Sequence, residues 1–240
     1  SLLKKKKSLI LKKFTKINLT QQKYSFMDEG QIQIIKPFGP SIIKAKIPIK
    51  IVENLNDYID EIVANEKKSL HLDHGKNLVG DVTQEFKLEK EIMEVSGWSK
   101  FLASCVSKWV EIEMKSKLTK FKMIDSWVVR QFENEYNPTH WHSGHISGAG
   151  FLKVPKNLGK HVQTKENQTY KGGILELIHG SRMFSSQSVM SIKPEVGLFY
   201  FFPNYLMHAV FPFKGTDEER RSISFNANID DDIYNVYGKQ

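Results

Sequence analysis

The sequence predicts an α+β protein in which N-terminal helices brace a β-sandwich or barrel. Apolar stripes at helical spacing occupy the first half of the chain, and short apolar runs separated by turn residues occupy the second half. Helices early and many short strands late are typical of a sandwich or barrel supported by helices. With 240 residues, the chain is long enough to build one substantial core.

Two helices are expected in the N-terminal half. After an extended stretch at residues 32–51, apolar residues recur at helical spacing over 51–63, with Asn54 as a candidate N-cap. The polar segment 67–76 is expected to be a loop. A second apolar stripe over 98–110 predicts the clearest helix of the chain.

The C-terminal half is expected to form strands. Val196–Phe202 is continuously apolar, as in a strand buried on both faces, and Arg221–Asn228 alternates between apolar and polar residues. The expected strands are 126–132, 140–142, 148–154, 173–179, 188–192, 196–202, 208–213 and 221–228.

The net charge of +8 belongs to one end of the chain. Residues 1–26 contain eight lysines and no acidic residue, so the remainder holds 27 basic against 27 acidic residues. This distribution gives no convincing nucleic-acid site outside the tail. With one cysteine, Cys105, no intrachain disulfide can form, and no apolar run is long enough to span a bilayer.

We expect two regions along the chain. Residues 1–26 form a basic tail that is either a disordered arm or non-native sequence upstream of Met27. Residues 27–240 form a single domain, with helical support at about 51–120 and a β-barrel core at about 121–229. The expected location is the cytoplasm, and the oligomeric state is left open.

Three histidines, His140, His142 and His145, lie within six consecutive positions near the start of the strand-rich half. His140 and His142 are two residues apart, so their side chains lie on one face if the strand is extended. Imidazole suits iron, zinc, copper and nickel, whereas calcium and magnesium prefer oxygen ligands. A pair of this kind entering a β-run favours metal binding over two unrelated surface histidines. His208, which follows a buried strand and a Pro-Asn turn, is the best candidate for a third ligand.

An arginine further along can complete a site for an anionic cosubstrate. Arg220, Ser222, Ser224 and Asn226 share one face of the last strand. If Arg220 points inward, its fork-shaped guanidinium can bind a carboxylate with Ser222 beside it. Taken alone, Arg220 reads as a surface residue at a strand start, but in combination with the histidines the inward position is favoured. Asn226 and Gln131 are polar residues of β-runs that can also point inward.

The order of these motifs resembles the Fe(II)/2-oxoglutarate-dependent oxygenases, and more narrowly the 2OG-Fe(II) oxygenases often encoded by bacteriophages. The segments that carry the resemblance are NPTHWHSGHISGAGFLKVP, GGILEL, PEVGLFYFFPNYLMHAVFPF and RRSISFNAN. The resemblance covers about residues 27–229. It implies a double-stranded β-helix (jelly-roll) barrel, and the host cytoplasm as location if the protein is phage-encoded.

The resemblance also implies the chemistry. Fe(II) is held by a facial triad, and a basic residue of the eighth core strand, by position Arg220, binds the distal carboxylate of 2-oxoglutarate. With O2, the reaction hydroxylates a protein side chain or a small molecule and releases succinate and CO2. On this basis His140, His142, His208 and Arg220 are the expected catalytic residues, with Ser222 as a further cosubstrate contact.

One departure from the family pattern leaves alternatives open. The usual triad is His-x-Asp or His-x-Glu with a distal His, but here His142 stands where the carboxylate is expected. Either His142 is a neutral third ligand or a carboxylate comes from elsewhere; an alignment with the halogenase variant, which lacks this carboxylate, is less favoured. Other functions compatible with three histidines are a non-oxidative cupin-type metal-binding barrel and a catalytically inactive binding barrel.

A literal His-x-Asp motif, His71-Leu-Asp73-His74, lies in the polar segment between the two helices. A triad needs this motif on a core strand, so the segment is expected to be a loop at the substrate rim. His145 is expected to face away from the site, and His161 and His179 to pack locally. The substrate itself carries no signature in this sequence.

Overall fold

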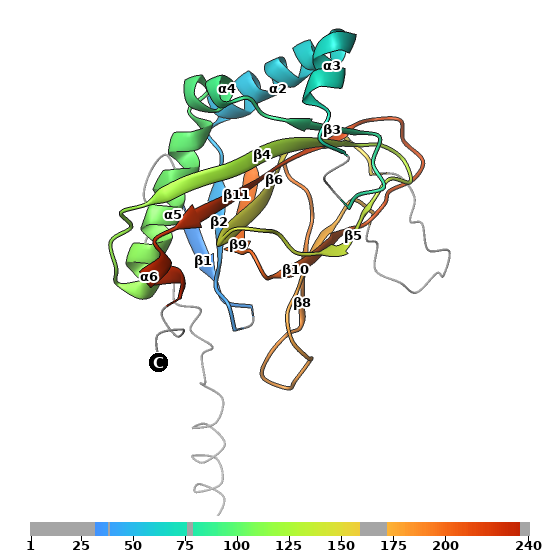
Figure 1. Cartoon of the computed structure of the whole chain (residues 1–240). Coiled ribbons are helices and arrows are strands. Elements are labelled where there is room, and N and C mark those ends of the chain that lie inside the picture. Colours follow the sequence, from blue (N-terminus) through green and yellow to red (C-terminus); the bar gives the residue numbers. More distant parts are fainter. Residues whose placement is uncertain (1–31, 38, 76–78, 159–171, 236–240) are drawn as a thin grey trace, which may run out of the picture.

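The computed structural model describes residues 32–37, 39–75, 79–158 and 172–235. It combines two antiparallel sheets with helices that cover one of them (Figure 1). In chain order, the elements are β1 (Ile32–Ile35), β2 (Ile42–Lys46), α2 (Ile49–Ala64), α3 (Glu66–Leu72), β3 (Gln84–Lys87), α4 (Lys90–Val95), α5 (Trp98–Met114), β4 (Phe121–Gln131), β5 (Asn137–His140), β6 (Ile146–Lys153), β7 (Leu175–Ile178), β8 (Val189–Ile192), β9 (Leu198–Pro203), β10 (Met207–Val210), β11 (Arg220–Ile229) and α6 (Asp231–Tyr234). The mixed helix-and-sheet class predicted from the sequence is confirmed.

The larger sheet has seven strands and the smaller sheet four. Their orders are β1-β2-β9-β6-β11-β4-β3 and β5-β10-β7-β8, and every pair of neighbouring strands is antiparallel. Consecutive strands cross repeatedly from one sheet to the other, for example β4 to β5 and β5 to β6. Strands that are far apart in sequence therefore become neighbours, as β11 lies between β4 and β6.

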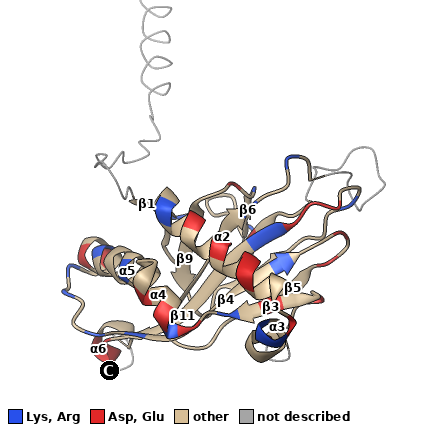
Figure 2. Cartoon of the chain, turned by 90° about the horizontal axis from the view of Figure 1, so that it is seen from above, with Lys and Arg blue, Asp and Glu red and all other residues tan. Residues whose placement is uncertain are grey.

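The outer face of the larger sheet packs against the helices. The apolar stripes of α2 and α5 are buried there with Phe199 and Phe201 of β9 and Phe225 of β11. Strand β6 can approach these rings because Gly148 and Gly150 lack side chains: a Cβ on Gly150 would lie 2.6 Å from the Leu198 carbonyl oxygen. The outer helices carry interspersed acidic and basic residues (Figure 2), some of them paired one turn apart.

A second, smaller apolar cluster fills part of the space between the two sheets. It joins Phe151 and Phe202 of the larger sheet to Leu175 and Leu177 of β7. These residues are almost fully buried. The cluster holds the two sheets together beside a cavity, whose lining includes Phe151 and Leu175 of the cluster.

Several local predictions differ from the structure. The first helix begins at Ile49 behind Pro48, so Asn54 lies inside it and the predicted N-cap is wrong. The segment expected to be a loop contains helix α3, whose Asn65 N-cap accepts a hydrogen bond from the Lys68 backbone N–H. The basic tail at 1–26 lies outside the described residues. None of the described helices is long and apolar enough to cross a membrane.

Candidate functional site

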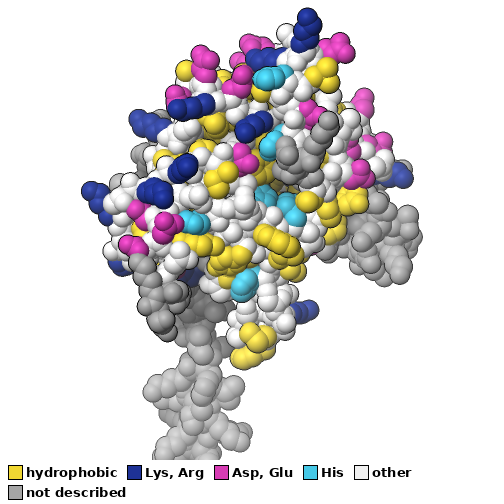
Figure 3. Space-filling model, viewed as in Figure 1, with side chains coloured by type: hydrophobic (Ala, Val, Ile, Leu, Met, Phe, Trp, Pro, Cys, Tyr) yellow, Lys and Arg dark blue, Asp and Glu magenta, His cyan; other side chains and the backbone are white. Residues whose placement is uncertain are grey.

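A cavity of about 500 Å³ lies between the two sheets. Its larger-sheet wall comes from the inward residues of β4 and β11, and its smaller-sheet wall from β5, β7 and β10. On the face seen in Figure 3, histidine side chains reach the surface among hydrophobic ones. The exposed ring of Trp141 belongs to the lining, so the cavity has an aromatic residue where it meets solvent.

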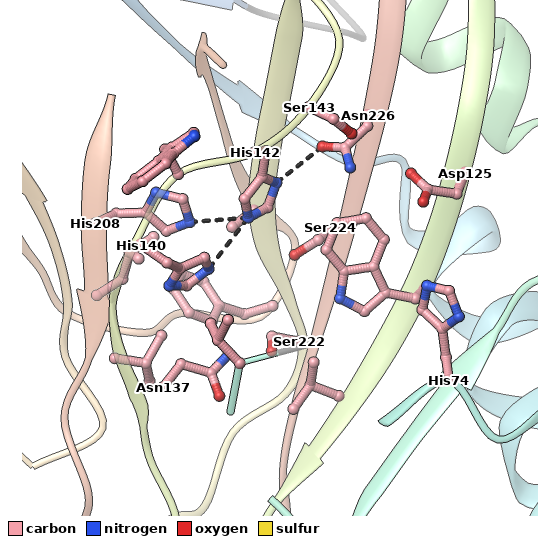
Figure 4. A pocket seen from close by; sticks show the side chains of 18 of the residues that line it. His74, Asp125, Asn137, His140, His142, Ser143, His208, Ser222, Ser224 and Asn226 are labelled. Atoms are coloured by element: carbon pink, nitrogen blue, oxygen red, sulfur yellow. Dashed lines mark hydrogen bonds between the residues drawn. The ribbon is translucent and has the colours of Figure 1, made fainter. Parts of the chain in front are cut away.

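Three histidines meet on the smaller-sheet side of this cavity. His140 ends β5, His208 lies directly opposite it on β10, and His142 follows in the next loop. The Nε2 atom of His142 lies 3.2 Å from Nε2 of His140 and 3.1 Å from Nε2 of His208 (Figure 4). Two imidazole nitrogens bound to one ion at about 2.1 Å lie about 3–3.4 Å apart, so these separations fit a shared metal ion.

The outward nitrogen of each ring is already engaged. Nδ1 of His140 donates to the Pro138 carbonyl at 2.7 Å, and Nδ1 of His208 to the Leu206 carbonyl at 2.9 Å. Nδ1 of His142 bonds the Asn226 side-chain oxygen at 2.8 Å. Because a neutral imidazole has one N–H, each Nε2 then presents a lone pair to the others. Three lone pairs at this distance repel one another unless a cation lies among them.

Burial keeps these histidines neutral. Burial, together with the nearby His140, lowers the pKa of His142 to about 4. It also lowers the pKa of His140 and takes that of His208 well below its ordinary value. Neutral imidazole is the form that binds a metal, so the cluster is ready to bind one at neutral pH.

His140 and His142 come together for a different reason from the one that the sequence predicts. His140 and His142 do not share a strand face, because β5 ends at His140. The chain turns through Gly144, whose φ of +84° favours glycine, and the His142 backbone N–H bonds the Asn204 carbonyl. The turn brings the His142 ring back over the cavity. Among the described residues, no Asp or Glu belongs to this cluster.

Arg220 lies in the same cavity, on the wall formed by β11. Its side chain is 1% exposed, stacks on Phe151 and donates to the Gln131 side chain at 3.0 Å and to Ser222 at 3.4 Å. Burial lowers its pKa to about 9, so it remains a cation at neutral pH. Its Nε has no hydrogen-bond partner among the described residues. A buried cation with an unused donor fits the carboxylate of a small dianion.

Neighbouring Arg221 points the other way. It contacts Glu219, Asn56 and Asp60 on the helix-covered side of the sheet. The strand alternation thus places Arg220 in the cavity with Ser222, Ser224 and Asn226, as the sequence predicts. The reading of Arg220 as a surface residue is wrong.

Two further lining residues, Asp125 and Trp127, were not predicted as site residues from the sequence. Asp125 and Trp127 lie on β4 and face the cavity, and Figure 4 shows Asp125 and His74 in its lining. His74 packs against Trp127 with ring centroids 6.1 Å apart. Their signal is the cross-strand register, since Asp125 lies opposite Asn226 and Trp127 opposite Ser224. A single sequence does not provide this register.

None of the other histidines that the structure describes belongs to the cluster of His140, His142 and His208. His71 is exposed on α3 and does not approach the triad, whereas His74 of the same motif reaches the cavity wall. His145 stacks on Tyr234 with ring centroids 4.0 Å apart and, as expected, does not line the cavity. His161 lies outside the described residues.

Comparisons with known proteins agree with this picture. Residues 125–226 match the family model described as "Putative 2OG-Fe(II) oxygenase". This range begins at the cavity residue Asp125 and ends at Asn226, and it includes all three clustered histidines and Arg220. No curated protein is similar enough in sequence to match the chain.

Several solved structures of low sequence identity are similar to the chain, one of them with a TM-score that reaches 0.50. The α-ketoglutarate-dependent epimerase SnoN, from nogalamycin biosynthesis, has a TM-score of 0.50 and 15% identity, covering 77% of this chain and 76% of that one. A Pseudomonas putida prolyl-4-hydroxylase has a TM-score of 0.49 and 12% identity, over 77% and 91% of the two chains. The viral collagen prolyl hydroxylase of Paramecium bursaria Chlorella virus-1 has a TM-score of 0.49 and 16% identity, over 78% and 94%.

The resemblance predicted from the motifs is therefore confirmed by an independent family match over the strands that build the cavity. This family uses Fe(II), 2-oxoglutarate and O2, and its members are oxidoreductases. Residues 125–226 of this chain are thus similar to the 2OG-Fe(II) oxygenase family.

Proposed function

We propose that the protein is a dioxygenase that hydroxylates a protein side chain or a small molecule while converting 2-oxoglutarate to succinate and CO2. The observation that carries this proposal is the presence of the three convergent histidines and a buried, incompletely bonded Arg220 in one cavity. The first group suits a divalent metal and the second a carboxylate. Together they suit a metal-bound cosubstrate with a free carboxylate end.

The proposed roles follow from the contacts. His140, His142 and His208 hold Fe(II) through Nε2, because their Nδ1 atoms are engaged elsewhere. Arg220, aided by Ser222, binds the distal carboxylate of 2-oxoglutarate, and Gln131 orients the guanidinium. When bound, Fe(II) supplies the O2-dependent oxidation that couples loss of CO2 to substrate hydroxylation.

The surrounding side chains shape this site. Phe151 lies against the Arg220 guanidinium, and Leu175 and Val129 add apolar surface on either side. A carboxylate that enters this region loses water, and the attraction between it and Arg220 becomes stronger in the low-dielectric interior. The remainder of the cavity, from His74 to Trp141, is available to the substrate.

The strand arrangement supports a double-stranded β-helix. Strands β4 to β11 supply four neighbours in each sheet, β9-β6-β11-β4 and β5-β10-β7-β8. Two facing sheets of eight strands are the jelly-roll architecture. We propose that this core, at about 121–229, and the helical support at about 51–120 form one domain within residues 27–240.

A second candidate is a three-histidine metal barrel of the cupin type, which needs no 2-oxoglutarate. The absence of a carboxylate from the described cluster favours it. The unused donor of Arg220 favours the dioxygenase, because a cupin-type site has no need of a buried cation in the same cavity. A binding barrel without catalysis is the third reading.

Anaerobic reconstitution with Fe(II), followed by addition of 2-oxoglutarate and air, tests the proposal. We expect succinate release that depends on Fe(II), because enzymes of this kind turn over the cosubstrate slowly without substrate. His208→Ala should abolish the release, since it removes the most buried ligand. Folded protein that binds zinc tightly and releases no succinate would contradict the dioxygenase and favour the cupin-type site.

A further inference from the structure

The three histidines do not neutralise the charge of a divalent metal ion bound among them. Its ligands are neutral, and a divalent ion among them keeps its full double charge. Among the described residues that line the cavity, Asp125 is the one acidic residue. It lies on β4 of the larger sheet, whereas His140 and His208 lie on the smaller sheet.

Asp125 is connected to the cluster through Asn226. Three adjacent strands place Ser147, Asn226 and Asp125 side by side, because Asn226 is the Cα partner of both Ser147 and Asp125. The Asn226 oxygen accepts hydrogen bonds from the Ser147 hydroxyl at 2.8 Å and from His142 Nδ1 at 2.8 Å. Its amide nitrogen is therefore on the side of Asp125 (Figure 4), and the interaction with Asn226 is one of those that lower the Asp125 pKa.

The groups that donate hydrogen bonds to Asn226 fix the orientation of its side-chain amide. A hydroxyl and an imidazole N–H both donate to the Asn226 oxygen, so the amide cannot be turned around without losing both bonds. The amide N–H2 can only donate, and the Asp125 carboxylate can only accept when ionised. The pKa of Asp125 is raised, because burial outweighs the opposing effects of nearby His74, the Asn226 side chain and Lys87.

We propose that Asn226 positions His142 as a metal ligand and that Asp125, through Asn226, supplies from the second coordination shell the negative charge that the ligand set lacks. This inference rests on the proposed metal site. It identifies Asp125 and Asn226 as positioning residues and gives His142 a fixed tautomer with Nε2 toward the metal. It also explains why a histidine can stand at the position where related sites carry a carboxylate.

Cobalt(II) binding to the full chain tests the inference without requiring turnover. Co(II) reports its ligand field in visible absorption, and competition with a chelator gives its dissociation constant. Asn226→Leu and Asp125→Asn should each weaken Co(II) binding by about 10–100-fold and change the spectrum, as is typical for loss of a second-shell partner.

A charge-relocating double variant distinguishes positioning from mere structure. In Asp125→Asn/Asn226→Asp, the carboxylate accepts directly from His142 and the new amide donates to it, so the network keeps its bonds and net charge. We expect this variant to bind Co(II) at least as tightly as the wild type. If it binds as weakly as the single variants, the charge argument is wrong.

Asn56→Leu is the matched structural control. Asn56 also makes side-chain hydrogen bonds, to the Leu152 carbonyl and to Arg221, but on the helix-covered side of the sheet. It should lower the melting temperature and leave Co(II) affinity unchanged.

The outcomes separate the inference from the proposed function. Wild-type affinity and spectrum in both Asn226→Leu and Asp125→Asn, with binding still lost in His208→Ala, would overturn only the inference. Failure of the wild type to bind Co(II) through His208 would overturn the metal site itself and the inference with it.

Discussion

Arg220 and Arg221 are neighbours in the chain, but their guanidinium groups lie on opposite faces of β11. Arg220 faces the cavity and bonds Gln131 and Ser222, while Arg221 is paired with Glu219 and Asp60. One step along a strand thus separates a group with an unused donor from a fully engaged structural ion pair. The two arginines form an internal comparison for any test of cosubstrate binding.

Arg220→Lys should raise the KM for 2-oxoglutarate by about tenfold or more, because lysine keeps the charge but loses the planar fork worth about 1.4 kcal/mol. Steady-state succinate assays at varied 2-oxoglutarate measure this change. Arg221→Lys should instead lower the melting temperature and leave the KM within about twofold of the wild type. A higher KM in Arg221→Lys alone would mean that Arg221 holds the cosubstrate.

Glu85 provides a second residue-level prediction. It is 1% exposed, and neither carboxylate oxygen has a hydrogen-bond partner among the described residues. Burial, together with nearby Asp73 and Glu135, raises its pKa to about 7. The folded protein therefore holds a proton that the unfolded chain releases between pH 4.5 and about 7. Since the native state binds more protons there, stability falls as the pH rises through this range.

Glu85→Gln should remove this loss, so the variant should be more stable than the wild type at pH 8 and similar to it at pH 5. Urea unfolding at the two pH values measures the difference.

Glu219→Gln is the contrasting control. Burial raises the pKa of Glu219, but hydrogen bonds from Arg130 and Arg221 lower it to about 2, so its stabilisation is present above pH 4.5 and lost as the pH falls toward 2. Glu219→Gln should be less stable at both pH values. If the wild type were more stable than Glu85→Gln at pH 8, the proposed cost of ionising buried Glu85 would be contradicted.

At the scale of elements, β6 shows how the fold depends on close packing. It runs between β9 and β11, and its glycines allow the rings of Phe199 and Phe225 to lie against its backbone. The same strand carries Ser147 and Phe151 on its cavity side. Packing on one face therefore fixes the position of site residues on the other.

Gly150→Ala should destabilise the fold by about 1–3 kcal/mol, because the new methyl group must displace Phe199 or the Leu198 carbonyl. Urea unfolding gives the free energy directly. Gly39→Ala is the control, since a Cβ there meets only an ordinary contact at 3.5 Å. Equal stability of the two variants would show that β6 can shift at little cost.

Elements with strong periodicity could be predicted from the sequence, and the loop that completes the site could not. The stripe of α5 and the alternation of β11 gave the correct faces, because burial of one face imposes that pattern. The position of the His142 ring depends on the turn at Gly144 and on a backbone bond to Asn204. These are long-range contacts that local spacing does not encode. The pairing of Asp125 with Asn226 depends on strand register in the same way.

On the scale of the whole molecule, two sheets and their connections bring distant segments to one cavity. The histidine cluster draws on residues 140, 142 and 208, the proposed carboxylate site on 220 and 222, and the opposite wall on 74 and 125. Helices on the outer face of the larger sheet stiffen one wall of this cavity. The site is therefore a product of the complete fold, and a metal ion bound in it should stabilise that fold.

Metal addition should therefore raise the melting temperature of chelator-treated protein. At a free metal concentration one hundred times the dissociation constant, the stabilisation should be about 2.7 kcal/mol, or about 5–10 °C for a chain of this size. Scanning calorimetry with and without Co(II) measures the shift. The His208→Ala protein should show no such shift; an equal shift would place the metal elsewhere.

The central claim is that the three histidines and Arg220 act as one site. Calorimetric titration of 2-oxoglutarate into the protein tests it most directly. We predict that binding requires Co(II) or Fe(II) and weakens sharply in both His208→Ala and Arg220→Ala. Binding of 2-oxoglutarate that is indifferent to the metal and to Arg220 would contradict the claim.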